Sequence, residues 1–195
     1  MKIKSIKDKE KKYLILDISI KTKLIILATK NKIIDMIKFS ISKEFVENII
    51  PFIQKIIHKN NIKLKDLNGI IVGQGPGAFI GIRIAVLTSK ILSIGLNIPL
   101  YKISSLILLS SGHINKNNII TPKIYAYNNL YYGISFQKNK IILSENIYNN
   151  SVLNRFSNHL LLDLNNIKIS LLQTFFYMKK VLNPHFLKPK YYDIN

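Results

Sequence analysis

The chain has 195 residues, and its 29 lysines and arginines outnumber its 10 acidic residues, so the formal net charge is +19. Hydrophobic residues make up 48% of the sequence, which excludes an intrinsically disordered chain and allows a folded core. There is no cysteine, so disulfides, thiolate metal sites and a catalytic cysteine are excluded.

Almost all of the basic residues are lysines, and they are scattered through every segment. One interpretation is an attraction to nucleic acid. The other is codon drift, because isoleucine and asparagine are also abundant. We favour drift as the main cause, since net charge bears on non-specific association and not on the fold.

The N-terminal residues 1–12 are mostly charged and are expected to form a loose basic arm. No long apolar segment follows this arm, because Asp17 and Lys21 interrupt it. No apolar run approaches the roughly 18 residues that a membrane-spanning helix needs. We therefore expect a cytoplasmic protein without a membrane segment.

Three β-rich runs with polar turns between them predict an antiparallel meander over Tyr13–Ser19, Lys23–Thr29 and Ile33–Ile41. Asp17 is unusual because it is a carboxylate within an apolar strand, where it needs hydrogen bonds or a cation. It either contacts magnesium and phosphate or caps a turn, and Ser19 is the neighbouring hydroxyl that would share that role.

A helix is predicted from an N-cap at Ser42 to about Asn60, with Pro51 inside it. Apolar residues recur along it at helical spacing, so it has one apolar face. The members of this face that we single out as a candidate contact surface are Val46, Ile49, Ile50 and Ile53.

A glycine-rich turn follows the predicted strand Leu67–Val72 and leads into a helix. A glycine loop at a helix N-terminus is typical of an anion cradle, but a tight turn that packs the helix on a sheet explains the same pattern. The P-loop and dinucleotide fingerprints both fail, because each requires glycine where Ala78 stands. The motif residues are Gly73, Gly75, Pro76, Gly77, Gly81 and Arg83.

The helix predicted over Phe79–Leu96 is apolar almost all round, which indicates burial on most sides. One of its faces carries only small residues at a spacing of four: Gly81, Ala85, Ser89 and Ser93. Such a stripe lets another backbone approach closely, from this chain or from a second one. We expect Ala85→Arg to block binding of a partner and to leave the fold largely intact. If this substitution instead unfolds the protein, the stripe is packed inside the chain itself.

The second half opens with three more predicted strands, as the first half does, which suggests a duplicated architecture. The polar residues 115–118 precede them and are typical of a domain boundary. The remaining predicted elements are the strand Pro99–Ile103, a short helix through Leu109, the strands Ile119–Tyr127, Leu130–Gln137 and Ile141–Tyr148, the helices Ser151–Leu160 and Asn165–Leu182, and the extended segment Pro184–Pro189.

The sequence offers no convincing catalyst or metal site. None of the four histidines, which are His58, His113, His159 and His185, is four residues from another. Spacing alone also supports no Ser/His/Asp triad, since triads are recognised by their geometry. We therefore expect no catalytic residue and no metal ligand.

Four segments resemble the motifs of one family. Leu14–Ser19 resembles "LALDTS", Val72–Ile84 resembles "VGxGPGSFTGxRIG", Asn97–Leu106 resembles "xIPxxGVSSLEAL", and Glu47–Pro51 sits where the family has "HSExLLP". These are the marks of the bacterial TsaB family, also called YeaZ. The resemblance covers about residues 13–109 and is weak beyond them.

The resemblance implies an α/β fold of the actin-like, RNase H-like (ASKHA) class with two domains, each opening with a three-stranded meander. It implies an N-terminal domain over residues 13–109, which carries the partner-binding helices, and a reduced C-terminal domain over residues 110–195. It also implies a non-catalytic partner of TsaD, the enzyme that adds threonylcarbamoyl to adenosine 37 of tRNAs reading ANN codons.

The same resemblance sets the expected partners. TsaD would bind through helices of the first domain as a heterodimer, and TsaE would join in the larger complex. ATP would be used by the complex and not held by this chain, and contact with tRNA would be indirect. Whether the chain forms a homodimer in the absence of TsaD is left open by the sequence.

The sequence also departs from the family pattern. Ala78 and Ile80 replace hydroxyl residues of the glycine motif, and "DARxGEVY" becomes Tyr125–Tyr132, which lacks both acids and the arginine. The main alternative is an ATPase or phosphotransferase of the same fold that uses Asp17 and the Gly73–Gly77 loop. A metallopeptidase is a third hypothesis, and the lack of a ligand pair argues against it.

Overall fold

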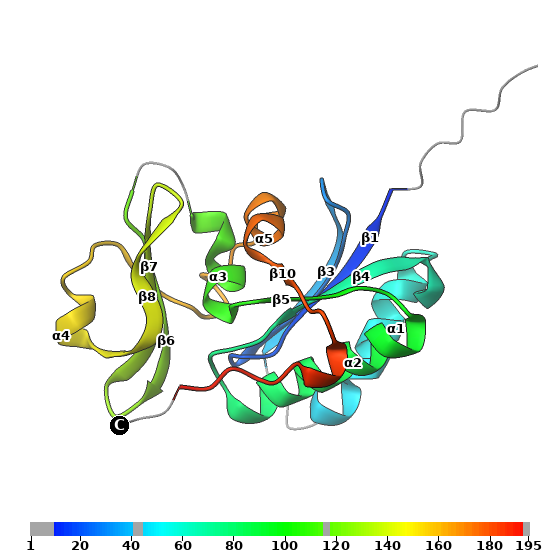
Figure 1. The fold of residues 1–195 in the computed structure, drawn as a ribbon, viewed down its shortest axis with the longest axis horizontal. Helices are drawn as coiled ribbons and strands as arrows, with labels where there is room; N and C mark the ends of the chain where they lie inside the picture. The colour runs from blue at the N-terminus through cyan, green and yellow to red at the C-terminus, as the bar shows by residue number, and fades with distance from the viewer. Residues whose placement is uncertain (1–9, 41–44, 115–117, 193–195) are drawn as a thin grey trace, which may run out of the picture.

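The computed structural model describes residues 10–40, 45–114 and 118–192, which form two sheets side by side with helices around the larger one (Figure 1). The larger sheet has six strands in the order β10-β5-β4-β1-β2-β3. The smaller sheet has four strands in the order β8-β7-β6-β9.

The larger sheet begins with the predicted meander. β1 (Lys12–Asp17), β2 (Thr22–Ala28) and β3 (Ile33–Ser40) pair antiparallel. β4 (Leu67–Gly73) lies parallel to β1, and β5 (Leu100–Ile103) lies parallel to β4. The meander is therefore confirmed, although its first strand starts one residue earlier and ends two residues earlier than predicted.

Helices cover both faces of this sheet (Figure 1). On one face lie α1 (Phe45–Lys59) and α2 (Phe79–Leu96); on the other lie α3 (Ser105–Ser110) and α5 (Leu171–Tyr177). Alternate residues of one strand consequently enter different cores: Leu14 joins the α1/α2 side and Ile15 the α3 side. Burial on both faces explains why the strands read as continuous apolar runs.

The smaller sheet is a second meander of β6 (Thr121–Tyr127), β7 (Leu130–Gln137) and β8 (Lys140–Asn149). Its two turns, Asn128-Asn129 and Lys138-Asn139, have positive φ at all four residues. Such turns suit the right-handed twist of paired strands, and asparagine tolerates this conformation well. The three strands predicted for the second half are thus confirmed.

The predicted helices of the last third are mostly wrong. In place of Ser151–Leu160, the chain forms only α4 (Asn150–Leu153) and then β9 (His159–Leu161), which pairs with β6. The helix predicted over Asn165–Leu182 shrinks to α5, which Ser170 caps. Pairing of distant strands overrode the local helical pattern here.

The C-terminal segment returns to the first sheet. After α5, β10 (Lys179–Lys180) pairs with β5, and a 3₁₀ turn, η3 (Pro184–Phe186), replaces part of the predicted extended run. The other short 3₁₀ turns are η1 (Leu64–Asp66) and η2 (Ser111–His113). A division at residue 110 therefore separates the two sheets, but the C-terminal segment crosses back to the first one. The predicted N-cap Ser42 lies outside the described residues, as do residues 1–9 of the arm.

Candidate functional site

In the glycine loop between β4 and α2, three backbone N–H groups donate hydrogen bonds to other groups of the same chain. The N–H of Gln74 donates to the Ile103 carbonyl at 2.9 Å, that of Gly75 to Ser105 Oγ at 3.1 Å, and that of Ala78 to the Ser19 carbonyl at 2.6 Å. A phosphate cradle needs several convergent N–H groups that are free to bind the anion. These three groups are engaged, so the geometry favours a tight turn that anchors the helix.

The glycines of this loop are required by close approach to β1 and the turn after it. A Cβ atom at Gly73 would lie 1.8 Å from Asp17 Oδ2, and one at Gly77, where φ is +149°, would lie 2.1 Å from the Ser19 carbonyl oxygen. At Gly81, in the first turn of α2, it would lie 1.9 Å from the Ile18 carbonyl oxygen. The spacing of the glycines is therefore explained by close backbone packing, which leaves no room for a side chain at these positions.

Asp17, the carboxylate that the sequence singled out, is completely buried at the end of β1. Its Oδ1 accepts hydrogen bonds from the N–H of Ser19 at 2.9 Å and from its hydroxyl at 2.5 Å, and its Oδ2 faces Gly73 and Ser105. Burial raises the pKa of Asp17, while the Ser19 and Ser105 hydroxyls and the charge of Lys23 partly offset that rise. The structure thus brings Asp17 and Ser19 together, but as an enclosed turn cap.

The raised pKa of Asp17 predicts a specific pH dependence of stability. A folded-state pKa above the usual value of about 4 means that the folded chain holds this proton more tightly than the unfolded chain. Stability should therefore fall as the pH rises from about 4 through the folded-state pKa. We expect Asp17→Asn, which stays neutral, to lose this part of the pH dependence in urea unfolding from about pH 4 to about pH 8. Superimposable pH profiles for the two proteins would contradict the assignment.

The small-residue stripe of α2 faces the chain's own sheet. Gly81 and Ala85 are buried against it, and Ser89 and Ser93 are 0% and 2% exposed. Ser93 Oγ donates to the Ile98 carbonyl at 2.6 Å, which ties the end of the helix to the following loop. The interpretation of this stripe as a surface for another chain is therefore corrected, because its small side chains bring α2 close to β4 and β1.

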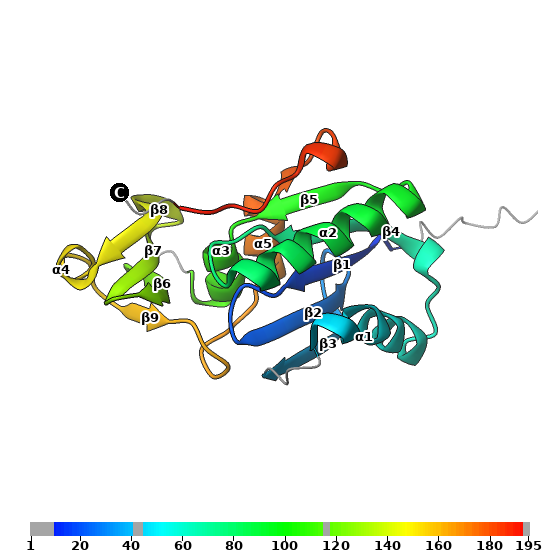
Figure 2. The ribbon, with the colours of Figure 1, turned by 90° about the horizontal axis from the view of Figure 1, so that it is seen from below.

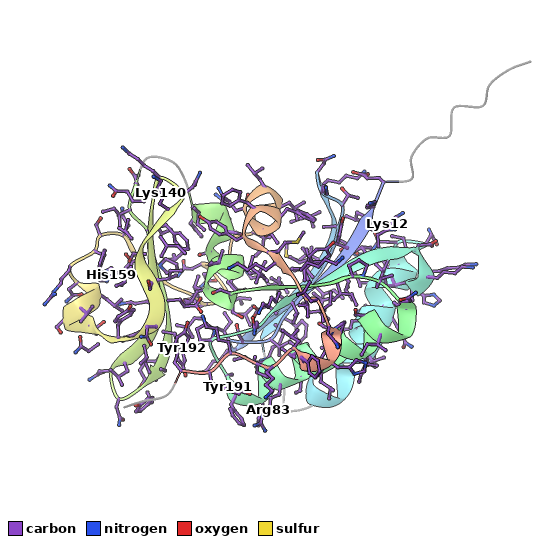
Figure 3. All side chains as sticks on the ribbon, viewed as in Figure 1. Lys12, Arg83, Lys140, His159, Tyr191 and Tyr192 are labelled. Atoms are coloured by element: carbon purple, nitrogen blue, oxygen red, sulfur yellow. The ribbon has the colours of Figure 1, made fainter. Side chains whose placement is uncertain are left out.

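The opposite face of α2 carries large apolar side chains in solvent. Ile80, Leu87, Ile91 and Ile94 stand seven, four and three residues apart, so they form one row along the helix, and Phe79 lies beside its first member. We call this row the α2 stripe; its members and exposed fractions are Phe79 51%, Ile80 65%, Leu87 58%, Ile91 61% and Ile94 44%. Arg83 lies on it, with its guanidinium 3.8 Å from the Phe79 ring centroid and its Nε donating to the Tyr191 hydroxyl (Figure 3).

The predicted contact residues of α1 are likewise mostly internal. Ile49 and Ile53 are 4% and 1% exposed and belong to the core between α1 and the sheet. Ile50 is 44% exposed and remains available to another chain. The side chain of Val46 lies outside the described residues. Sequence spacing identified the apolar faces of both helices, but it did not identify which face is covered.

By length and composition α2 is apolar enough to cross a membrane, contrary to the expectation that no run approaches that length. The core helix of a soluble protein passes the same test. Here one side of α2 packs on a sheet, with Ile82, Ala85 and Val86 in the core, so its composition reflects a covered inner face and an apolar outer one.

A cleft of about 740 Å³ lies between the two sheets, beside the first turn of α2. Its lining is mainly apolar and aromatic, with Phe79 from α2, Tyr125 from β6 and Tyr132 from β7. Lys21 contributes a basic group and Asp163 an acidic one. The cleft adjoins the glycine loop at Gly77, whereas the Asp17 carboxylate is enclosed beneath that loop.

Metal ligation finds no support in the part of the chain that the structure describes, where no three His, Cys, Asp or Glu residues cluster. His113 and His159 lie on different elements, and the Nε2 atom of each is within hydrogen-bonding distance of backbone carbonyls.

A protein-family model described as TsaD, tRNA N6-adenosine threonylcarbamoyltransferase, matches residues 39–147. The tRNA threonylcarbamoyladenosine biosynthesis protein TsaB of Buchnera aphidicola subsp. Schizaphis graminum (strain Sg) is 32% identical over 116 residues, which cover 58% of this chain and 55% of that protein. A tRNA N6-adenosine threonylcarbamoyltransferase of Christiangramia forsetii is 38% identical over 63 residues, 32% of this chain and 18% of that protein. The chain spans about half the length of these curated TsaB relatives.

Among solved structures, YeaZ from Pseudomonas aeruginosa superimposes with a TM-score of 0.69 at 17% identity, over 93% of this chain and 99% of that chain. At this level of identity the likeness concerns the fold. The predicted α/β, actin-like fold with two meander-opened sheets is confirmed.

Proposed function

The chain belongs to the family of the matching model and, within it, to the TsaB (YeaZ) proteins, and we propose that it is a non-catalytic accessory subunit of tRNA threonylcarbamoylation. It would act in the cytoplasm by binding and activating TsaD, which modifies adenosine 37 in tRNAs that read ANN codons. ATP would be used by the complex, and TsaE would join the larger assembly.

The observation that carries this proposal is the α2 stripe. An 18-residue helix that keeps five large apolar side chains in solvent is suited to pack against a helix of another protein. Ile50 of α1 supplies a further exposed apolar side chain on the same side of the sheet. We therefore assign the partner contact to the outer face of α2, in place of the small residues on its inner face.

The proposed partner is a TsaD-type transferase. A region of this chain is similar to such a transferase from Christiangramia forsetii, so the two proteins would share one fold and meet through equivalent helices. A second copy of this chain is the competing partner for the same stripe, because two like surfaces of one chain can also pair.

We expect the double substitution Ile80→Asp and Ile91→Asp to weaken binding to the cognate TsaD about a hundredfold or more, since each places a charge in an apolar contact. Both side chains are more than half exposed, so the free energy of unfolding should change little. The measurement is co-purification of the two chains, followed by titration calorimetry.

The matched control is Leu172→Asp with Phe176→Asp on α5, at side chains that are 78% and 69% exposed on the other face of the sheet. This pair should leave partner binding unchanged. If the α5 pair breaks the complex and the α2 pair does not, the contact lies elsewhere. If no complex forms with the unaltered chain and tRNA modification persists without it, the proposed function is wrong.

The alternative function, an ATPase or phosphotransferase of the same fold, is favoured by the cleft between the sheets. The enclosed Asp17 and the engaged loop N–H groups argue against it. Tight binding of Mg-ATP by the isolated chain, lost in Asp17→Asn, would support this alternative over the accessory role.

A further inference from the structure

A second groove, of about 640 Å³, lies between the edge of the larger sheet and the C-terminal segment. The chain leaves β10, turns through η3 and returns past α2 toward the smaller sheet, so residues 180–191 frame one side (Figures 1 and 2). Lys102 of β5 and Gln74 of the glycine loop contribute the other side. We call this space the lysine groove; its basic residues are Lys102, Lys180, Lys188 and Lys190.

Hydrogen bonds hold the C-terminal segment at both ends of the groove. At one end the N–H of Val181 donates to the Leu100 carbonyl at 2.9 Å. At the other, the N–H of Lys190 donates to the Gln74 carbonyl, and Gln74 Nε2 donates to the Lys188 carbonyl, both at 2.8 Å. The lysines are therefore carried by a defined backbone frame.

Acidic residues neutralise little of the charge in this groove. Lys190 pairs with Glu145 at 2.8 Å, and the same carboxylate also accepts hydrogen bonds from Tyr192 and Ser104. For Lys102, Lys180 and Lys188, no ion pair is found within residues 10–40, 45–114 and 118–192, and no acidic residue lines the groove. The register of β10 against β5 pairs Lys180 with Tyr101 and Lys179 with Lys102, so the side chains of Lys180 and Lys102 leave opposite faces of the sheet. Lys102 and Lys188 are therefore the two cations of this groove that no carboxylate among the described residues neutralises.

We propose that the lysine groove binds the phosphates of an RNA backbone. Lysine side chains bind phosphate as point charges, and binding is driven by release of the counterions that surround the polyanion. The ring of Phe186 lines the same groove and is 78% exposed, so it offers a surface on which a base can stack. The inference rests on the proposed function only for the choice of RNA as the polyanion.

The position of the groove fits a substrate held beside a bound partner. The C-terminal segment has the groove on one side and α2 on the other, where Lys90 Nζ donates to the His185 carbonyl at 2.8 Å and Arg83 Nε to the Tyr191 hydroxyl at 3.1 Å. RNA in the groove would therefore lie next to a protein docked on the α2 stripe, so this subunit would contact tRNA directly.

The test is fluorescence anisotropy of a labelled tRNA transcript with the full chain over a series of salt concentrations. We expect the double substitution of Lys102 and Lys188 by glutamine to reduce the slope of log affinity against log salt by about two, since each lysine neutralises one phosphate. Affinity at about 0.1 M salt should fall roughly fiftyfold, as counterion release predicts for two phosphates.

The matched control replaces two exposed lysines outside the groove, Lys30 and Lys65, by glutamine. It removes the same net charge and should change the slope by less than about one. Equal losses of affinity in both double variants would mean diffuse attraction by the +19 charge and would overturn the inference, as would an unchanged slope in the groove variant. Co-purification with TsaD should survive in the groove variant, so failure to bind RNA and failure to bind the partner are separable results.

A second variant tests the stacking surface. Phe186→Leu keeps an apolar side chain but removes the ring, so affinity should fall about fivefold or more with an unchanged salt slope. A drop in slope would instead indicate that the lysine frame had moved, and unchanged affinity would exclude Phe186 from the site.

Discussion

Replacing Gly81 by alanine is expected to lower the free energy of unfolding by about 3 kcal/mol or more. Alanine is normally the better helix former by about 1 kcal/mol, so propensity alone predicts the opposite sign. The added Cβ would lie 1.9 Å from the Ile18 carbonyl oxygen, which belongs to the backbone after β1 and cannot rotate away. The helix must move off the sheet, and the core beneath it opens.

Gly95 in the same helix is the control for this prediction. No atom lies within 4 Å of a Cβ placed there, so Gly95→Ala should raise the free energy of unfolding by about 0.5–1 kcal/mol. Urea unfolding of the two variants and the unaltered protein provides the comparison. If both substitutions stabilise the chain, α2 does not approach β1 as closely as described.

Ala85→Arg is expected to prevent folding, whereas Leu87→Arg, two residues further along α2, should leave the fold intact. Ala85 is fully buried beneath the helix, so arginine there adds volume to a packed core and buries a charge without a partner. The destabilisation should exceed about 4 kcal/mol, a large part of the stability of an ordinary domain. Leu87 is 58% exposed, and a substitution at such a site usually changes stability by no more than about 0.5 kcal/mol.

The two arginine variants also separate folding from binding. Leu87→Arg should keep the circular dichroism and melting temperature of the unaltered chain and yet fail to co-purify with TsaD, because it places a charge in the α2 stripe. Ala85→Arg should give insoluble or unfolded protein. A well-folded Ala85→Arg that fails to bind would restore the small residues as the contact surface.

These contrasts follow from the two different faces of α2. The inner face carries small side chains because the helix approaches β1 and β4 closely. The outer face carries large apolar side chains, which stay exposed among the described residues. Gly73 and Gly77, which precede the helix, allow the same close packing, because Asp17 and Ser19 lie directly against them. The motif that suggested phosphate chemistry is accounted for by the way the helix docks on its own sheet.

The sequence by itself determined the two meanders, the strand–loop–helix unit around Gly73–Gly77 and the family. These features depend on local signals: apolar runs long enough to pair, asparagine at turns that need positive φ, and glycine where the backbone has no room for a side chain. Such signals act between residues that are near one another in the chain, so they can be recognised without knowledge of the fold.

Only the tertiary structure decided which face of α2 is covered, because an apolar pattern on all sides of a helix does not identify its neighbour. It also decided the short elements β9 and β10, whose partners β6 and β5 lie far away in the chain and outweigh local helix propensity. The lysine groove exists for the same reason: Lys102 and Lys188 line one groove only because the C-terminal segment returns to the glycine loop at Gln74.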